Sequence, residues 1–205
     1  MPAKTYLSAD ERRARTVAAV VDICAREDPA RITTGNIAEH MHVTQGALFK
    51  HFPSKDAIWE AVASWAAEQV MSRLEAAAAG AGDPIAALEA MFHAHIDFIA
   101  QHPGVPRLLV GQLQHDRQTP ARRVVRSLLL RYRESVRDRL AEASQGGLLR
   151  PGLDIDAAAT QFIGTVQGLV MQALMLGDMA RIGGMGAGVF AIYLHGIRKD
   201  PGSTR

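Results

Sequence analysis

Apolar residues recur at helical spacing along almost the whole chain, and this periodicity restricts the fold more than any other feature of the sequence. Near the N-terminus Val17, Val20, Val21 and Cys24 stand at positions i, i+3, i+4 and i+7, which places them on one face of a helix. Similar stripes follow in later segments, and no segment shows a convincing strand pattern. The sequence therefore predicts an all-α fold with about nine helices.

Proline, glycine and capping residues divide this pattern into short helices followed by longer ones. Pro29 ends a first helix over residues 10–26. The residues that can cap the next helices are Thr33 or Thr34, Thr44 and Ser54. Later helices are expected over residues 54–80, 83–102, 106–115, 120–144, 154–176 and 187–199. We predict two domains, a helix-turn-helix DNA-binding domain over residues 1–55 and a helical domain for ligand binding and dimerisation over residues 56–205.

Composition and charge narrow the class of protein without fixing its partner. Hydrophobic residues make up 48% of the 205 residues, which is enough for a folded core, and the net charge is only +2. A DNA-binding role must therefore rest on placed residues and not on bulk charge. The single cysteine allows no intramolecular disulfide, no leader is recognisable, and polar residues interrupt the most apolar run, 162–176. We expect a cytoplasmic protein that does not cross a membrane.

The segment 32–57 has the pattern of a helix, a tight turn and a second helix, followed by a third capped helix. A helix-turn-helix places the first residues of its second helix at base edges in the major groove. The residue types suit that position, because the Gln45 amide can pair with adenine, Gly46 allows close approach and Ala47 fits a thymine methyl. Side chains that can reach phosphates stand at Thr44, Lys50, His51 and Lys55.

The string from Gly46 to Ala57, Gly-Ala-Leu-Phe-Lys-His-Phe-Pro-Ser-Lys-Asp-Ala, closely resembles the matching part of the TetR family of bacterial transcriptional regulators (TetR/AcrR-like). The matching stretch begins at about Thr33, and the length and helical layout extend the resemblance over the whole chain. The resemblance implies a DNA-binding regulator. Together, the residue types and the resemblance predict DNA contacts from Thr33, Thr34, Thr44, Gln45, Gly46, Ala47, Phe49, Lys50, His51 and Lys55.

Three residues depart from the family pattern. Phe49 stands where tyrosine is usual, so this side chain has no hydroxyl to bond a phosphate. His42 stands in the turn where glycine is usual, which predicts either a left-handed residue or a different turn. Asn36 stands where an acidic residue commonly completes a capping box, which predicts a weaker helix start. These departures leave the helix-turn-helix in place and bear on its target sequence and exact contacts.

Two features of the N-terminal part have a plainer interpretation. The segment 32–57 would be a three-helix subdomain without a partner if its polar residues were only solvated. Arg12, Arg13 and Arg15 can add phosphate contacts, or they can form an exposed charged face with the acidic residues beside them. The matching positions favour the DNA-binding interpretation for the segment and leave both interpretations open for the arginines.

The resemblance also implies that the C-terminal two thirds of the chain holds a ligand pocket and a dimer interface. Gly164 and Gly168 stand four apart on a very apolar helix, where glycine costs about 1 kcal/mol relative to alanine. Close packing would explain them, against either a second copy of the chain or a helix of the same chain. The predicted dimer interface comprises Gly164, Gly168, Val189, Phe190 and Tyr193.

A ligand site in a helical bundle combines apolar walls with a few polar side chains. Polar residues interrupt apolar helix faces at several positions, although each alone can equally be a satisfied core or surface residue, so the prediction concerns the cluster. The predicted lining is Trp65, Met91, His95, Phe98, Gln112, Tyr132, Phe162 and Met175. It suits a small, largely apolar or aromatic effector, while Arg131 would also allow an anion.

Enzymatic interpretations find little support. His93 and His95 are two residues apart, so they diverge on a helix and cannot hold one metal ion together. The glycine-rich run 183–188 lacks the third glycine and the preceding strand of a dinucleotide fingerprint, and a hinge or close-packing segment explains it better. We predict a protein that is not an enzyme and that uses no metal or cofactor.

These observations predict a homodimeric, ligand-responsive regulator, most simply a repressor of a palindromic operator. Effector binding in the bundle would move the long helix that begins near Ser54, so that the two DNA-binding segments no longer fit the operator. The alternative is a DNA-bound scaffold that recruits a protein partner and senses no small ligand. A solid bundle with an exposed apolar groove would favour the scaffold.

Overall fold

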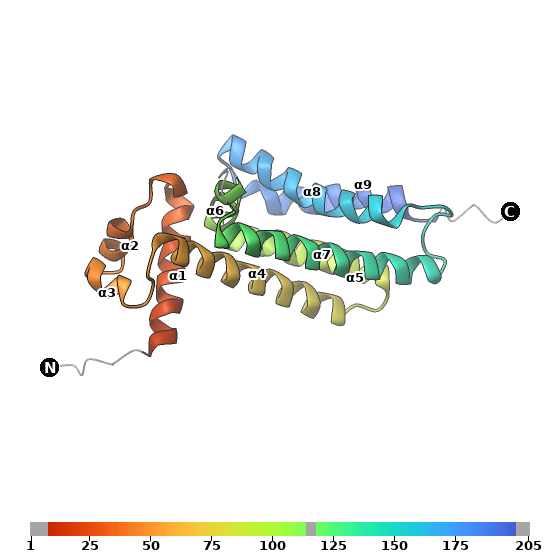
Figure 1. Cartoon of the computed structure of the whole chain (residues 1–205). Helices are drawn as coiled ribbons and strands as arrows, with labels where there is room; N and C mark the ends of the chain where they lie inside the picture. Colours follow the sequence, from red (N-terminus) through yellow and green to blue (C-terminus); the bar gives the residue numbers. More distant parts are fainter. Residues whose placement is uncertain (1–7, 114–117, 200–205) are drawn as a thin grey trace. The chain divides into compact units, whose positions relative to one another are not determined.

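The computed structural model describes residues 8–113 and 118–199, which form an all-α fold as predicted (Figure 1). Two compact units are present, residues 1–67 with 102–126 and residues 68–101 with 127–205. The elements in chain order are α1 (Ala9–Arg26), the 3-10 helix η1 (Pro29–Arg31), α2 (Thr34–His40), α3 (Gln45–Phe49), α4 (Lys55–Ala79), α5 (Pro84–Gln101), α6 (Gly104–Leu113), α7 (Pro120–Gln145), α8 (Ile155–Leu176) and α9 (Arg181–Ile197). The end of the predicted helix over 106–115 lies outside the described residues.

Polar side chains at the helix starts fix the elements of the N-terminal part. Thr33 caps α2 and Thr44 caps α3, each accepting a hydrogen bond from the backbone N–H three residues on, at 3.1 and 3.2 Å. The Asn36 side chain accepts a hydrogen bond from the Thr33 N–H at 3.0 Å, which completes a capping box. A capping box therefore forms with asparagine at this position, because an amide oxygen accepts the Thr33 N–H as a carboxylate would.

In the first unit α6 packs directly on the backbone of α1. A Cβ atom on Gly104 would collide with the carbonyl oxygen of Val21 and would lie 2.7 Å from the backbone nitrogen of Ala25. Arg107 donates to the carbonyl oxygen of Ala25 at 3.0 Å. Cys24 is buried on the same helix, and burial raises the pKa of its thiol to about 12. Cys24 is therefore a core residue, as its place on the apolar stripe predicts.

Aromatic side chains from α5, α8 and α9 fill the second unit. Phe92, Phe162 and Phe190 are at most 2% exposed, and their ring centroids lie 5.2–6.4 Å apart. Tyr193 joins the cluster, and its hydroxyl donates to the carbonyl oxygen of Ala158 at 3.1 Å. This cluster ties α9 to both α5 and α8.

The last helix begins earlier than the predicted start at residue 187. α9 includes the glycine-rich run 183–188, so the run is helical and not a hinge or lead-in. A Cβ atom on Gly186 would lie 3.6 Å from the side chains of Phe92 and Ile96, which shows that a small residue lets α9 approach α5. Close packing therefore explains this glycine. The predicted helix start at residue 187 is wrong because tertiary packing outweighs the poor intrinsic helix propensity of glycine.

Among the described residues one helix, α8, is long and apolar enough to cross a membrane, with a mean hydropathy of 1.2 and 39% of its apolar window buried. A core helix of a globular protein has the same length and composition. Seven of its residues, including Phe162 and Val166, are buried within the second unit.

Candidate nucleic-acid interface

The α2–turn–α3 segment presents its polar residues outward over a small apolar base. Ile37, Ala38 and Leu48 are buried, and Phe52 beyond α3 is fully buried. Among the ten predicted DNA-contact residues the structure exposes Thr33, Thr44, Gln45, Gly46, Phe49 and Lys50, and half-buries Thr34, Ala47, His51 and Lys55. All ten thus stay accessible along one continuous segment, and none belongs to the core.

The turn between the two helices contains a left-handed residue. His42 has a φ of +56°, which confirms one of the two conformations that its departure from glycine predicts. Histidine is among the non-glycine residues that enter this region most readily. The Val43 N–H donates to the carbonyl oxygen of Ala38 at 2.9 Å, so the turn closes the end of α2 in the ordinary way for a left-handed cap.

A side-chain hydrogen bond joins α2 and α3 across this turn. Gln45 Nε2, on the first residue of α3, donates to Thr34 Oγ1, on the first residue of α2, at 2.7 Å. Sequence reasoning did not find this bond, because the two residues are eleven positions apart and only the tertiary turn brings them together.

Arg13 has a structural partner and does not belong to a purely solvated face. Its Nη1 donates to the carbonyl oxygen of His51 at 3.0 Å, and its guanidinium carbon lies 4.6 Å from the ring centroid of Phe52. The contacts tie α1 to the segment between α3 and α4. Lys55 Nζ in turn lies 5.2 Å from the ring centroid of Trp59. Two cations near α3 are therefore held in place by aromatic side chains.

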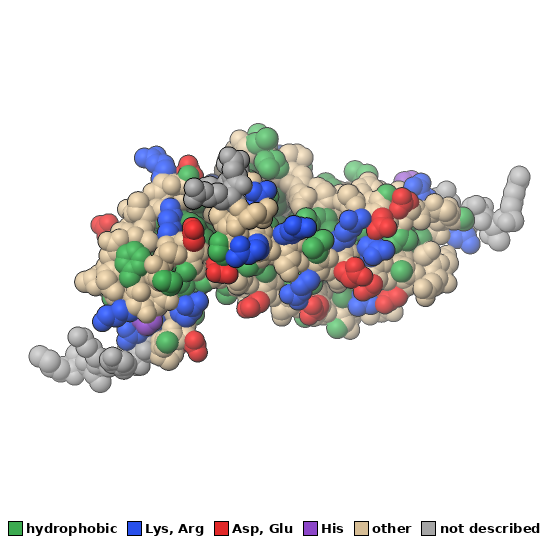
Figure 2. All heavy atoms as spheres, viewed as in Figure 1, with side chains coloured by type: hydrophobic (Ala, Val, Ile, Leu, Met, Phe, Trp, Pro, Cys, Tyr) green, Lys and Arg blue, Asp and Glu red, His purple; other side chains and the backbone are tan. Residues whose placement is uncertain are grey.

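On the face that Figure 2 shows, Lys and Arg side chains are dispersed among uncharged and acidic ones. This distribution agrees with the net charge of +2.

The second unit brings three of the predicted ligand-lining residues together. His95 Nδ1 lies 3.3 Å from the Tyr132 hydroxyl, and the Tyr132 ring packs edge-on against Phe162 at 6.1 Å. Burial lowers the pKa of His95 to about 4 and raises the pKa of Tyr132, so both side chains are neutral at pH 7. Met91 and Phe98, also on α5, are buried in the same unit.

The other predicted lining residues are distributed differently. Trp65 and Gln112 belong to the first compact unit, where Trp65 packs edge-on against His102 at 5.3 Å and Gln112 is buried. Met175 is 78% exposed on α8, so its assignment to an internal wall is wrong. The error arises because α8 is apolar on nearly all faces, and periodicity then cannot identify its inner side.

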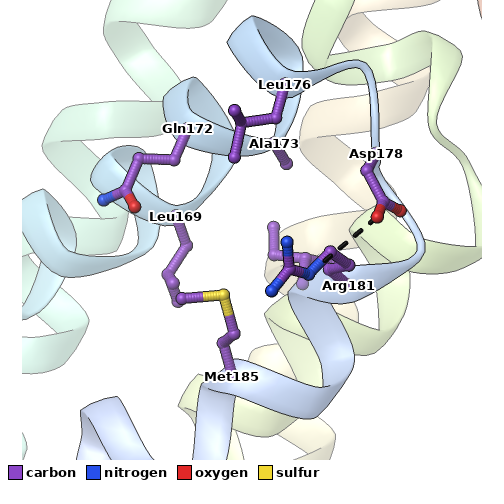
Figure 3. A pocket seen from close by; sticks show the side chains of 8 residues that line it. Leu169, Gln172, Ala173, Leu176, Asp178, Arg181 and Met185 are labelled. Atoms are coloured by element: carbon purple, nitrogen blue, oxygen red, sulfur yellow. Dashed lines mark ion pairs between the residues drawn. The ribbon is translucent and has the colours of Figure 1, made fainter.

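A small surface pocket of about 90 Å³ lies where α8 ends and α9 begins (Figure 3). None of the predicted lining residues belongs to it. Asp178 and Arg181 form an ion pair of 3.9 Å at its edge. Its apolar walls come from Leu169, Ala173, Leu176, Ile182 and Met185. The helical spacing of Leu169, Ala173 and Leu176 was visible in the sequence, but the turn that apposes α9 was not.

The residues of the predicted dimer interface divide into buried and accessible positions in the second unit. Phe190 and Tyr193 are 2% and 3% exposed inside the second unit, so they cannot be presented to a partner. Gly164 and Gly168 have open space where a Cβ atom would stand, and Val189 is half-buried. We define the α8–α9 outer face as the accessible positions Gly164, Gly168, Met171, Met175, Met185 and Ile192.

Known proteins are similar to this chain over both of its parts. Residues 18–62 match a family model described as bacterial regulatory proteins, tetR family, and residues 84–185 match one described as a tetracyclin repressor-like C-terminal domain. The nucleoid occlusion factor SlmA of Marinobacter nauticus is 30% identical over 140 residues, which cover 68% of this chain and 72% of that protein.

Solved structures with the same fold cover nearly the whole chain. The ketosteroid transcriptional regulator KstR2 of Mycobacterium tuberculosis has a TM-score of 0.77 at 21% identity, covering 98% of this chain and 100% of that one. The transcriptional regulator FadR of Bacillus subtilis, solved in complex with stearoyl-CoA, has a TM-score of 0.78 at 19% identity, covering 90% of this chain and 99% of that one.

Proposed function

The chain belongs to the TetR family of bacterial regulatory proteins and is a transcriptional regulator, and we propose that it is a ligand-responsive repressor that binds a palindromic operator as a homodimer. The observation that carries the proposal is the α2–turn–α3 segment, whose capped second helix exposes Gln45 and Gly46 at its start. TetR-family regulators are generally soluble, cytoplasmic DNA-binding proteins without enzymatic activity. We assign the same location and the absence of catalysis to this chain.

We assign DNA binding to residues 1–55 and effector binding and dimerisation to residues 56–205. TetR-family regulators dimerise, and the α8–α9 outer face supports such an assembly here. Gly164, Gly168, Met171 and Met175 follow one another at i, i+4, i+7 and i+11, so they share one side of α8. Two copies of this face would form a four-helix interface in which the glycines allow close approach. Two DNA-binding segments then meet half-sites separated by one or more helical turns.

The effector would be a largely apolar molecule with an uncharged hydrogen-bonding group. The His95–Tyr132 pair supports this assignment, because it is a neutral polar pair among aromatic walls. The stearoyl-CoA complex of the Bacillus subtilis regulator indicates that this fold can hold a long acyl group. Effector binding would shift the population toward a conformation in which α4 carries the DNA-binding segments away from the operator spacing.

A second candidate is a DNA-bound scaffold that recruits a protein partner. It is favoured by the relatives named nucleoid occlusion factors and by the packed aromatic core around Phe162, together with an exposed apolar α8–α9 face. A thermal-shift screen with neutral acyl and aromatic compounds separates the two. Stabilisation together with release of DNA supports the repressor, and the absence of any stabilising compound favours the scaffold.

The decisive test is fluorescence anisotropy with the DNA upstream of the chain's own gene, repeated over a range of salt concentrations. Wild type is expected to bind selectively, and Lys50→Ala to lower the slope of log affinity against log salt by about one. Arg150→Ala, which removes an exposed cation outside the interface, serves as the matched control and should leave the slope unchanged. Failure to bind this DNA and any sequence selected from a random library would overturn the proposal.

A further inference from the structure

The hydrogen bond between Gln45 and Thr34 is not needed to cap either helix. Thr33 already caps α2 and Thr44 already caps α3, so neither Thr34 nor Gln45 is required at a helix end. Gln45 is nevertheless exposed, and an exposed glutamine side chain without a partner samples several rotamers. The 2.7 Å bond to Thr34 Oγ1 holds this amide in one orientation before any DNA arrives.

The orientation determines which groups the amide can still offer. A glutamine amide has two N–H donors on Nε2 and one acceptor, Oε1. Thr34 takes one N–H, which leaves one donor and the acceptor. In the major groove adenine offers an acceptor at N7 beside a donor at N6, whereas guanine offers acceptors at both N7 and O6. The remaining groups of Gln45 therefore match adenine and lack the second donor that guanine would need.

The surroundings of Gln45 leave room for a base to approach. Gln45 is the first residue of α3, the place from which a recognition helix reaches base edges. Its neighbour Gly46 has no atom within 4 Å of where a Cβ would stand, and Ala47 carries only a methyl group. The two residues that follow Gln45 in α3 therefore add no bulky side chain beside its amide.

We propose that Thr34 sets the base specificity of Gln45 by holding its amide in the orientation that pairs with adenine and rejects guanine. Thr34 is a positioning residue in this role, because it acts on the base through Gln45. The inference rests on the proposed DNA-binding function and deepens it by naming the base that this position reads. It also separates two roles of one residue, since a Thr34 contact to a phosphate would affect all sequences alike.

The test measures discrimination between bases and not affinity alone. An operator is first selected from random DNA with wild type, and the base pair read by Gln45 is identified as the one at which Gln45→Ala loses selectivity. Wild type should prefer adenine over guanine there by on the order of tenfold. Thr34→Val, which keeps the shape and removes the hydroxyl, should reduce this ratio to about twofold or less, and Thr34→Ser should retain it.

Base analogues test the same inference without any change in the protein. Replacing the adenine by 7-deaza-adenine removes N7, and replacing it by purine removes N6. Each analogue should weaken wild-type binding several-fold and leave Gln45→Ala unchanged.

The outcomes separate the inference from the function on which it rests. If wild type shows no sequence-selective DNA binding, the proposed function is overturned. Selective binding in which Thr34→Val keeps the full discrimination would overturn only the role of Thr34. A wild-type preference for guanine at this pair would also overturn it, because both N–H groups would then face the groove and the amide oxygen would face Thr34.

Discussion

Glycines in two regions of the molecule have opposite surroundings. Gly104, at the start of α6, lies against the backbone of α1, where a Cβ atom would collide with the carbonyl oxygen of Val21. Gly164 and Gly168, on the outer side of α8, have no atom within 4 Å of where a Cβ would stand. The first glycine is explained by the fold of the chain itself. The other two weaken their helix, and no contact within the described residues requires a glycine there. The proposed dimer, in which this side of α8 packs against a second copy, would explain them.

The close contact of Gly104 with α1 predicts that a methyl group at this position destabilises the fold. Gly104→Ala should lower the free energy of unfolding by about 3 kcal/mol, because backbone atoms of α1 cannot yield as a flexible side chain would. Urea denaturation measures the change. Gly111→Ala in the same helix is the matched control and should stabilise slightly, since nothing lies within 4 Å of that position. Equal effects of the two substitutions would contradict the distinction.

His95 and Tyr132 form a buried polar pair in the second unit. The burial of His95 predicts that the free energy of unfolding depends on pH. Burial lowers the pKa of His95 to about 4, whereas in the unfolded chain it is about 6.5, so the unfolded state binds more protons between these values. The free energy of unfolding should therefore fall as the pH falls from about 6.5 to 4.5. The contribution of His95 should be about 2 kcal/mol. Urea denaturation of wild type and His95→Gln over this range isolates it, and parallel curves for the two proteins would count against the burial of His95.

The proposed role of the α8–α9 outer face in dimerisation is tested at an exposed apolar side chain. Ile192 on the α8–α9 outer face is 75% exposed, and Ile192→Lys should weaken dimerisation by about tenfold or more. Sedimentation equilibrium gives the dissociation constant. Leu130→Lys on α7 is the matched control, because Leu130 is 57% exposed and lies outside that face. A dimer that Leu130→Lys weakens as strongly as Ile192→Lys would move the interface elsewhere.

The smallest expected effect concerns two cations near α3, one bonded within the chain and one exposed. Arg13 donates a hydrogen bond to the carbonyl oxygen of His51, so its guanidinium has a partner within the chain. Lys50 is exposed and can contact a phosphate. Arg13→Met should weaken operator binding about fivefold, equivalent to one lost hydrogen bond, and leave the salt slope unchanged. Lys50→Ala should lower that slope. A lower slope for Arg13→Met would show that its guanidinium contacts the DNA backbone directly.

Local chemistry explains why some features could be predicted from the sequence. The caps Thr33, Thr44 and Ser54 stand at helix starts as expected, because a cap depends on residues within one turn of itself. The all-α fold followed from periodicity for a similar reason. The left-handed His42 is one of the two conformations expected from the sequence, because glycine is usual at that position of the turn.

Features that depend on how helices face one another were harder to predict. Phe190 and Tyr193 were assigned to a dimer interface and Met175 to an internal wall, and the structure reverses these positions. All three lie on helices that are apolar on most sides, so the inner side is decided by ring packing with Phe92 and Phe162 and not by periodicity. The bond between Thr34 and Gln45 was invisible for a related reason, since it exists only once the turn is formed.

The proposed recognition helix, α3, also shows how this fold could acquire new DNA targets. Of the five residues of α3, Leu48 alone is buried, and Thr44 outside the helix provides its cap. Substitutions at exposed positions usually change the free energy of unfolding by no more than about 0.5 kcal/mol. Substitutions at Gln45, Gly46 and Phe49, which are exposed, should therefore retain the fold. Under the proposed role of α3 they would change DNA specificity, by mutation or by library design.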